Sequence, residues 1–246
     1  MTALQRSAFR NAILRWIIQK AGLALDTADF NVALQREIGR TWFCPITDSA
    51  NITEFYHQNE LTGEYRPDWR SFARLHGGNP ALLVQHAATF GYQRIVLIED
   101  IVGSGSQMRD IRPLLAGVPT TLPIMIAPMI VCPDGAGEGE RICAAHPNVS
   151  FAPTLLLSKN SFVAPTPRPN EVPFFAEIRA LLTRTYSEVD NNIPADPQIV
   201  PYGPFGFNYT GALIVLYTNT PDNTIPIIHH RSDSWQPLFP RRRRIQ

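Results

Sequence analysis

No stretch of this chain stays apolar for the roughly 18 residues that a membrane-spanning helix needs. The three cysteines, Cys44, Cys132 and Cys143, have no CxxC spacing, so we expect reduced thiols and neither a disulfide framework nor a zinc site. The formal net charge is +1, which argues against a general attraction of the whole protein to nucleic acid or anionic lipid. Segment 1–22 carries charges through its apolar pattern and lacks a small-residue cleavage site, which predicts an amphipathic helix and a cytoplasmic protein.

What the chain contains instead is an alternation of helical and strand patterns. With 246 residues, of which 44% are hydrophobic, it can bury a large core without covalent crosslinks. The alternation predicts an α/β fold in which helices cover a parallel sheet and ligand loops follow the carboxyl ends of the strands. We expect helices over 4–22, 27–38, 79–92, 105–115, 139–146 and 173–186, and strands over 41–45, 94–100, 120–132, 149–157 and 211–219.

Three parts of the chain differ in composition. We expect a helical N-terminal element over 1–40, an α/β core over 41–157, and an extension over 158–246 that packs on the core as a hood. The extension begins with a proline-rich stretch, typical of a linker or lid. Within the core, Pro123 and Pro128 predict that the strand they belong to is irregular or lies at a sheet edge.

The segment RIVLIEDIVGSGSQM, residues 94–108, holds the strongest functional pattern. Its four apolar residues 95–98 predict a strand buried on both faces, with Glu99 and Asp100 where the strand emerges. Two adjacent carboxylates repel and are costly to bury, so we expect a polar ligand there. The vicinal hydroxyls of a ribose are one such ligand, because each can donate a hydrogen bond to one acid.

Small residues follow the acids directly. Gly103, Ser104, Gly105 and Ser106 lead into a predicted helix, an arrangement that closes backbone N–H groups around a phosphate. Acids followed by such a loop predict a site for a sugar 5-phosphate. A dinucleotide fold is disfavoured because Met108 stands where a third glycine belongs, and a P-loop because no GKS or GKT follows. An alternative is a plain strand-to-helix turn in which one acid acts as a cap.

The run from Val96 to Ser106 resembles the phosphoribosyl pyrophosphate (PRPP) signature of type I phosphoribosyltransferases. The resemblance implies a parallel α/β core that binds PRPP with Mg²⁺ and exchanges its pyrophosphate for a nitrogen nucleophile. The family's acid pair matches Glu99 and Asp100, which orient the ribose, with Asp100 meeting the metal indirectly through Mg–PRPP. Its phosphate loop matches residues 103–107, including Gln107.

The match has departures. Gly103 stands where purine-salvage members hold an aspartate base, so purine salvage is doubtful, and Gln107 replaces the usual threonine. Segment 44–51 lies where a pyrophosphate loop is expected, which makes Asp48 and Ser49 candidate substrate-binding residues. Three arginines further on are either pyrophosphate clamps or a solvated helical face: Arg66, Arg70 and Arg74.

Over a longer span the chain is similar to the PRTase-CE proteins of bacterial conflict and retron-type antiphage cassettes. Segment 43–59, the PRPP signature and segment 217–241 carry this similarity. It implies an effector or a regulatory partner of another cassette component, such as a reverse transcriptase or a regulator. The run Arg241–Arg244 is either a nucleic-acid contact or a solvated tail.

Three functional hypotheses remain open at this point. The first is an enzyme that catalyses attack at ribose C1, as a phosphoribosyltransferase or a nucleotide N-glycosidase-like hydrolase. The second is a module that senses PRPP or a nucleotide. The third is an interaction protein with an empty pocket. In the C-terminal segment, Asn219, Asn223 and His229 are either turn and surface residues or part of a hood that selects the base.

Overall fold

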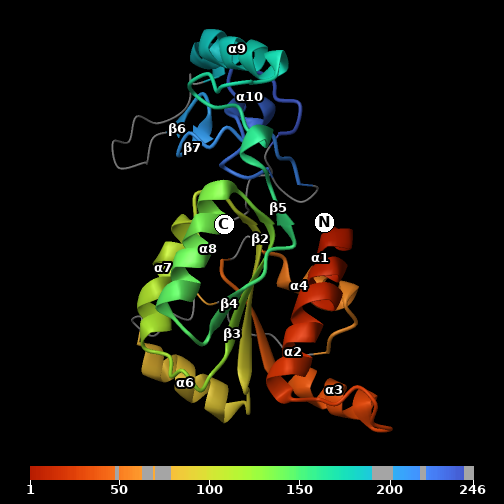
Figure 1. Ribbon diagram of the computed structural model, residues 1–246. Coiled ribbons are helices and arrows are strands. Elements are labelled where there is room, and N and C mark those ends of the chain that lie inside the picture. Colours follow the sequence, from red (N-terminus) through yellow and green to blue (C-terminus); the bar gives the residue numbers. More distant parts are fainter. Residues whose placement is uncertain (48–49, 63–68, 70–78, 190–201, 217–219, 241–246) are drawn as a thin grey trace. The chain divides into compact units, whose positions relative to one another are not determined.

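The computed structural model (Figure 1) describes residues 1–47, 50–62, 69, 79–189, 202–216 and 220–240. The chain divides into two compact units, Met1–Leu156 and Leu157–Gln246. Each unit has its own hydrophobic core. In the described part of the chain, no helix is both long enough and apolar enough to cross a membrane. All three cysteines are free thiols.

The first unit is built on a parallel sheet, which confirms the predicted α/β class. Its strands lie in the order β1-β2-β3-β4, and the short β5 pairs with β3 beyond β4. Central strand residues are almost wholly buried, as expected of a sheet covered on both faces. The strands are β1 (Thr41–Pro45), β2 (Arg94–Val102), β3 (Ile124–Val131), β4 (Val149–Phe151) and β5 (Leu155–Leu156).

Because the first four strands are added in sequence order and parallel crossovers are right-handed, the connecting helices fall on one face of the sheet. These are α6 (Pro80–Thr89), α7 (Ser106–Ala116) and α8 (Pro133–Ala145). One core cluster joins them to the sheet through side chains such as Leu83, Ile111 and Ile142, packed with Leu97 and Ile126. This crossover layer leaves the second face of the sheet to other elements.

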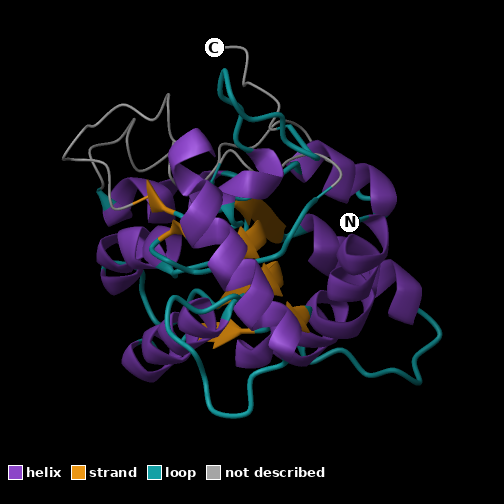
Figure 2. Cartoon of the chain, turned by 90° about the horizontal axis from the view of Figure 1, so that it is seen from above, coloured by secondary structure: helices purple, strands orange, loops and turns teal. Residues whose placement is uncertain are grey.

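An N-terminal layer covers that second face (Figures 1 and 2). It consists of α1 (Thr2–Ser7), a π-helical stretch η1 (Ala8–Ile13), α2 (Leu14–Ala21) and α4 (Ile52–Gln58). The ring of Phe9 lies 6.1 Å from the rings of both Phe43 on β1 and Phe55 on α4. The predicted first helix is therefore confirmed, and it ends where expected, at the left-handed Gly22 (φ 63°).

Two predicted boundaries in the first unit were wrong. The helix expected from residue 27 begins at Phe30, with Asp29 as its N-cap (α3, Phe30–Gly39). The expected strand 149–157 is divided into β4 and β5, which are separated by residues 152–154.

β3 is neither irregular nor at an edge, in contrast to the prediction from its prolines. It pairs with β2 in one unbroken register, and all its residues are buried. Pro128 lacks the N–H that would face residues 152–154, so one ladder bond on that side is lost. The pairing is kept around it, because Ala152 and Thr154 still donate their N–H groups to the carbonyls of Ile126 and Pro128.

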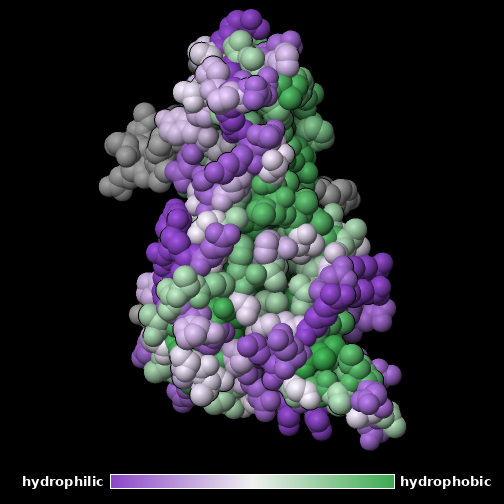
Figure 3. Space-filling view, in the orientation of Figure 1, coloured by the Kyte–Doolittle hydropathy of each residue, from purple (hydrophilic) through white to green (hydrophobic). Residues whose placement is uncertain are grey.

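The second unit contains one long helix and several short elements. Its core consists of Val163, Leu182, Phe205 and Ile225. Apolar side chains remain exposed at the start of the long helix, where Val172 and Phe174 are more than half exposed and Figure 3 shows apolar surface. The elements are η2 (Lys159–Ser161), α9 (Pro173–Val189), β6 (Tyr202–Gly203), β7 (Gly206–Phe207) and α10 (Pro226–His229).

The strand expected over 211–219 is not formed in its described part, 211–216. Ala212 instead makes isolated bridges to two different segments, at Phe162 and Thr224. Gly211 has φ 67°, and a Cβ there would lie 2.0 Å from the carbonyl oxygen of Val163. This close crossing of backbones explains why the apolar run does not continue as one paired strand. Residues 217–219 lie outside the described residues.

Candidate functional site

The acid pair lies within β2, because the strand runs two residues beyond Asp100. Pairing with β3 continues through Glu99, Ile101 and Val102 in the same register. Adjacent residues of a regular strand point to opposite faces of the sheet. Glu99 and Asp100 therefore have different surroundings, which the sequence pattern treated as one pair.

Glu99 is fully buried, and Thr47 binds its carboxylate. Thr47, two residues after the end of β1, donates its N–H to Oε2 at 3.0 Å. The Thr47 hydroxyl lies 3.1 Å from Oε1 and 2.9 Å from Oε2. These bonds offset the cost of removing the carboxylate from water, and they fasten the segment that follows β1 to the middle of the site.

Asp100 is the more accessible of the two acids, since it is half-buried. Its Oδ1 accepts the N–H of Ile101 at 2.7 Å, and among the described residues no group donates to its second oxygen. Segment 44–51 follows the neighbouring strand β1, as expected, because Pro45 pairs with Ile98. Asp48 and Ser49 lie outside the described residues, and their proposed role stays a prediction.

The small-residue loop turns sharply between β2 and α7. Gly105 is the N-cap of α7 and has a left-handed φ of 78°. A Cβ on it would lie 2.8 Å from the Cβ of Glu138 on α8, so glycine is required for both the conformation and the close approach. The hydroxyls of Ser104 and Ser106 are 3.3 Å apart.

The carbonyls of this loop are held from behind. Gly135 on α8 donates its N–H to the oxygen of Gly103 at 3.0 Å. Arg109 on α7 donates to the oxygen of Ser104 at 3.1 Å. Both peptide bonds are trans, and in a trans peptide the N–H points opposite to the C=O. The N–H groups of Ser104 and Gly105 therefore point together to the other side of the loop.

The loop leaves several backbone N–H groups without a backbone acceptor in the described part of the chain. No backbone carbonyl of the described residues accepts the N–H of Ser104, Gly105 or Ser106. Consecutive unpaired N–H groups and the positive end of a helix both favour a bound phosphate. The loop geometry thus fits the anion that the glycine and serine pattern predicted.

Gln107 connects the loop to the segment after β1. A small cavity of about 30 Å³ lies between Gln107, Thr47 and the buried indole of Trp69. The indole N–H of Trp69 has no acceptor among the described residues. The sequence analysis missed Thr47, Trp69, Arg109 and Glu138. Thr47 was within the quoted pyrophosphate-loop segment, whereas nothing in the pattern pointed to Glu138.

The described residues contain no group of three or more His, Cys, Asp or Glu side chains that could hold a metal ion. Cys132 lies beside the loop, where its N–H is bonded to the carbonyl of Val102. Burial, with the charge of Asp134, raises the pKa of Cys132 to about 12, so its thiol is not a nucleophile near neutral pH.

The other candidates divide between the second unit and residues that are not described. Asn223 donates to the hydroxyl of Thr210 at 3.0 Å, as in turn chemistry. His229 is buried, and its Nε2 lies 3.2 Å from the carbonyl oxygen of Thr224; burial lowers its pKa. The remaining candidates lie outside the described residues: Arg66, Arg70, Arg74, Asn219 and Arg241–Arg244.

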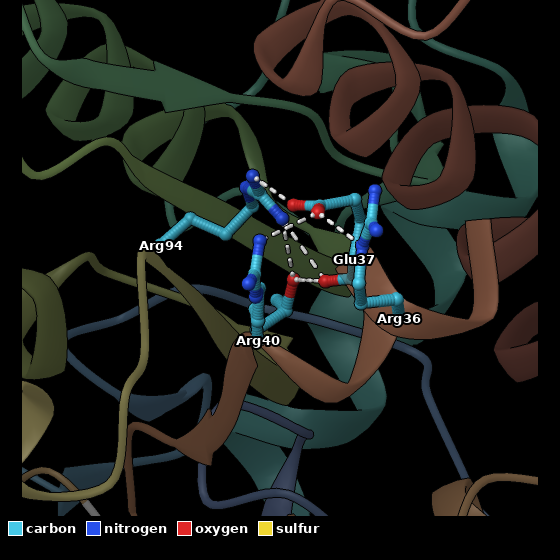
Figure 4. A network of polar contacts seen from close by, with 5 residues as sticks. Arg36, Glu37, Arg40 and Arg94 are labelled. Atoms are coloured by element: carbon cyan, nitrogen blue, oxygen red, sulfur yellow. Dashed lines mark hydrogen bonds and ion pairs between the residues drawn. The ribbon is translucent and has the colours of Figure 1, made fainter. Parts of the chain in front are cut away.

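A separate charged cluster lies at the amino end of β2, away from the loop (Figure 4). The buried Arg94 donates to the carboxylate of Glu37 at 2.9 Å, and Arg40 and Arg36 add contacts at 3.1 and 3.4 Å. Burial alone would raise the pKa of Glu37, but hydrogen bonds and charge from the arginines, chiefly Arg94, hold it below its usual value. This cluster joins α3 to the sheet and has the features of a structural ion pair.

Comparisons with known proteins gave one match. Residues 1–241 match the model of the family described as PRTase-CE. No curated protein and no solved structure matches the chain.

Proposed function

Because this chain belongs to the PRTase-CE family, we propose that it binds PRPP or a related ribose 5-phosphate nucleotide at the carboxyl end of β2. The family match supports a phosphoribosyltransferase-like protein. The observation that carries the choice of ligand is the loop of residues 103–107, whose anchored carbonyls leave two adjacent N–H groups turned outward.

In this proposal the 5-phosphate binds the N–H groups of Ser104 and Gly105 and the hydroxyls of Ser104 and Ser106. Gln107 contacts the same phosphate from the first turn of α7. Asp100, half-buried and just before the loop, accepts hydrogen bonds from the 2- and 3-hydroxyls of the ribose. The phosphate and the ribose diol would thus be recognised on either side of one turn, as binding of a sugar 5-phosphate requires.

Glu99 has a second task in the proposal. Since its carboxylate is buried and bonded to Thr47, it holds the segment after β1 against β2. Asp48 and Ser49 follow Thr47 directly in the chain, and we assign them to the pyrophosphate of PRPP. A direct bond from Glu99 to the ribose would require Thr47 to move.

The proposed chemistry is substitution at C1 of the ribose. The bond from C1 to the pyrophosphate oxygen breaks with its electron pair on pyrophosphate, and a nucleophile forms the new bond to C1. If Mg²⁺ is bound with the substrate, it would supply positive charge that stabilises the leaving pyrophosphate. The oxygen atoms available at this site suit Mg²⁺, because the phosphates of PRPP would supply most of its ligands and Asp100 offers one carboxylate. The protein's part is to orient C1 and the leaving group.

The cellular part of the proposal rests on the resemblance to conflict and retron-type cassettes. An antiphage effector of this class would act on nucleotides by attack at ribose C1, with water as nucleophile if it depletes them. A partner from the same cassette, a reverse transcriptase or a regulator, would control the site.

The alternative is a sensor that binds PRPP or a nucleotide and controls a partner without chemistry. Two observations favour it. Gly103 offers no acid that could relay a proton, and the carboxylate of Glu99 is already bonded to Thr47. The enzyme and the sensor share one pocket, so they differ in product and not in binding.

Calorimetric titration of PRPP with Mg²⁺, with pyrophosphate release followed in the same samples, separates the two. We expect binding by the wild type and its loss in Asp100→Asn, with Glu140→Gln as a matched control on the exposed side of α8. Binding with release identifies an enzyme, and binding without release identifies the sensor. If PRPP and nucleoside monophosphates fail to bind at millimolar concentration, both forms of the proposal are wrong.

Nucleic-acid contact through Arg241–Arg244 is a separate part of the proposal. Removing these four residues should lower affinity for DNA or RNA and reduce the salt dependence of binding, because each phosphate contact releases counterions. Equal affinity for DNA or RNA at low salt, with and without Arg241–Arg244, would rule the contact out.

A further inference from the structure

Glu138 is a buried carboxylate that the proposed chemistry does not use. It lies on α8, its side chain is 1% exposed, and three arginines surround it. Arg141 approaches to 2.8 Å, Arg109 to 4.0 Å, and Arg112 forms a close ion pair. A buried ion pair is often no more stabilising than apolar side chains of similar volume, so the position of Glu138 is of more interest than its contribution to stability.

The position of Glu138 is directly behind the phosphate loop. Its Cβ would be 2.8 Å from a Cβ on Gly105. One turn earlier on the same helix, Gly135 donates its N–H to the carbonyl of Gly103. Arg109 contacts both partners, because one nitrogen, Nη1, reaches the carbonyl of Ser104 at 3.1 Å and the carboxylate of Glu138 at 4.0 Å.

We propose that Glu138 is a positioning residue for the phosphate loop and that it acts through Arg109. Its carboxylate holds the guanidinium of Arg109 against the carbonyl of Ser104. That carbonyl then stays turned toward α8, and the N–H of Gly105 stays turned toward the ligand. The inference rests on the proposed function for its ligand, but it assigns a task to α8 that the PRPP-like signature does not contain.

The three arginines make a matched set of variants. Arg109→Met, Arg112→Met and Arg141→Met each remove one ion pair with Glu138, but of these three arginines Arg109 alone donates to a carbonyl of the loop. If Glu138 acts by holding the loop, Arg109→Met and Glu138→Gln each weaken PRPP binding about tenfold. Arg112→Met and Arg141→Met stay within about twofold of the wild type.

A double-variant cycle tests whether the effect passes through Arg109. The combination Arg109→Met with Glu138→Gln should bind no more weakly than either single variant, because both remove the same restraint. Additive losses would mean that Arg109 touches the ligand independently, and would overturn the proposal. So would a loss in Arg141→Met equal to that in Arg109→Met, since Glu138 would then act only by joining α7 to α8.

Amide hydrogen exchange in the ligand-free protein tests the restraint without PRPP. The N–H groups of Gly135 and Arg109 are bonded to the carbonyls of Gly103 and Gly105. Glu138→Gln should speed their exchange about tenfold relative to Arg141→Met. Unchanged exchange refutes the restraint. Faster exchange in a protein that binds no PRPP would uphold the restraint while the proposed function fails.

Discussion

Thr47 and Glu99 are 52 residues apart in the chain, yet Thr47 donates both its N–H and its hydroxyl to the Glu99 carboxylate. The parallel pairing of β1 with β2 brings them together, because Pro45 and Ile98 are partners at the ends of the two paired segments. This hydrogen bond joins the segment 44–51, which we predict to bind pyrophosphate, to the segment 99–107, which we predict to bind the ribose 5-phosphate. A change at one segment is therefore expected to reach the other.

Thr47→Val should destabilise the protein by about 1–3 kcal/mol, because it removes the hydroxyl that donates to the buried Glu99 carboxylate. Thr47→Ser keeps the hydroxyl and should cost less. Urea unfolding followed by circular dichroism measures both. Equal stability of the valine and serine variants would show that the hydroxyl contributes nothing.

Gly105→Ala should lower stability by more than Gly22→Ala and should abolish phosphate binding. Both glycines have positive φ, 78° and 63°, so alanine is strained by about 1–2 kcal/mol at either position. Only at Gly105, of these two, would the new Cβ meet other atoms within 4 Å. Thermal unfolding and PRPP titration of the two variants separate strain from contact. Intact binding in Gly105→Ala would contradict a ligand at this loop.

Arg94→Met should destabilise the protein by about 3–5 kcal/mol, since it leaves Glu37 as a buried charge without its main partner. Arg36→Met is the control, because the Arg36 side chain is 61% exposed and exposed pairs contribute little. Replacing Glu37 as well, in Arg94→Met with Glu37→Met, should restore part of the loss. Denaturant unfolding at pH 7 gives all three values.

Stability should depend on pH through Glu37. Its pKa in the folded protein lies below the usual 4.5, so the folded state favours the ionised form. The contribution is complete above pH 4.5 and is lost as the pH falls below that value through the folded pKa. The gap in unfolding free energy between wild type and Glu37→Gln should be constant from pH 7 to 5 and narrow under acid. A gap that widens under acid would contradict this sign.

Local patterns predicted the main elements of the first unit. The strand 41–45, the N-terminal helix ending at Gly22 and the helix capped by Asn79 follow from apolar periodicity and capping residues, which act within a few positions of the chain. The errors in the predicted elements arose where residues distant in the chain determine the local structure. Pro128 lies in a central strand because the bonds from Ala152 and Thr154 keep the pairing around its missing donor, and the apolar run at 211–216 makes only isolated bridges.

The site was predictable in part for the same reason. Glycines and serines after a buried strand indicate an anion loop; the loop has N–H groups that no backbone carbonyl of the described residues accepts, and the bound anion stays a prediction. The separate surroundings of Glu99 and Asp100 were not predictable, because they depend on how far pairing with β3 continues. Glu138 lies 33 positions beyond Gly105 in the numbering, on a helix whose placement only the folded sheet determines.

The N-terminal layer also has a consequence for how the protein forms on the ribosome. Residues 2–21 precede every strand of the sheet in the chain, yet Phe9 packs on Phe43 of β1 and on Phe55. The segment that covers the second face of the sheet is thus made before that face exists. During synthesis the apolar side chains of residues 2–21 lack their packing partners until the strands emerge, and they are shielded meanwhile by local helix formation or by a chaperone.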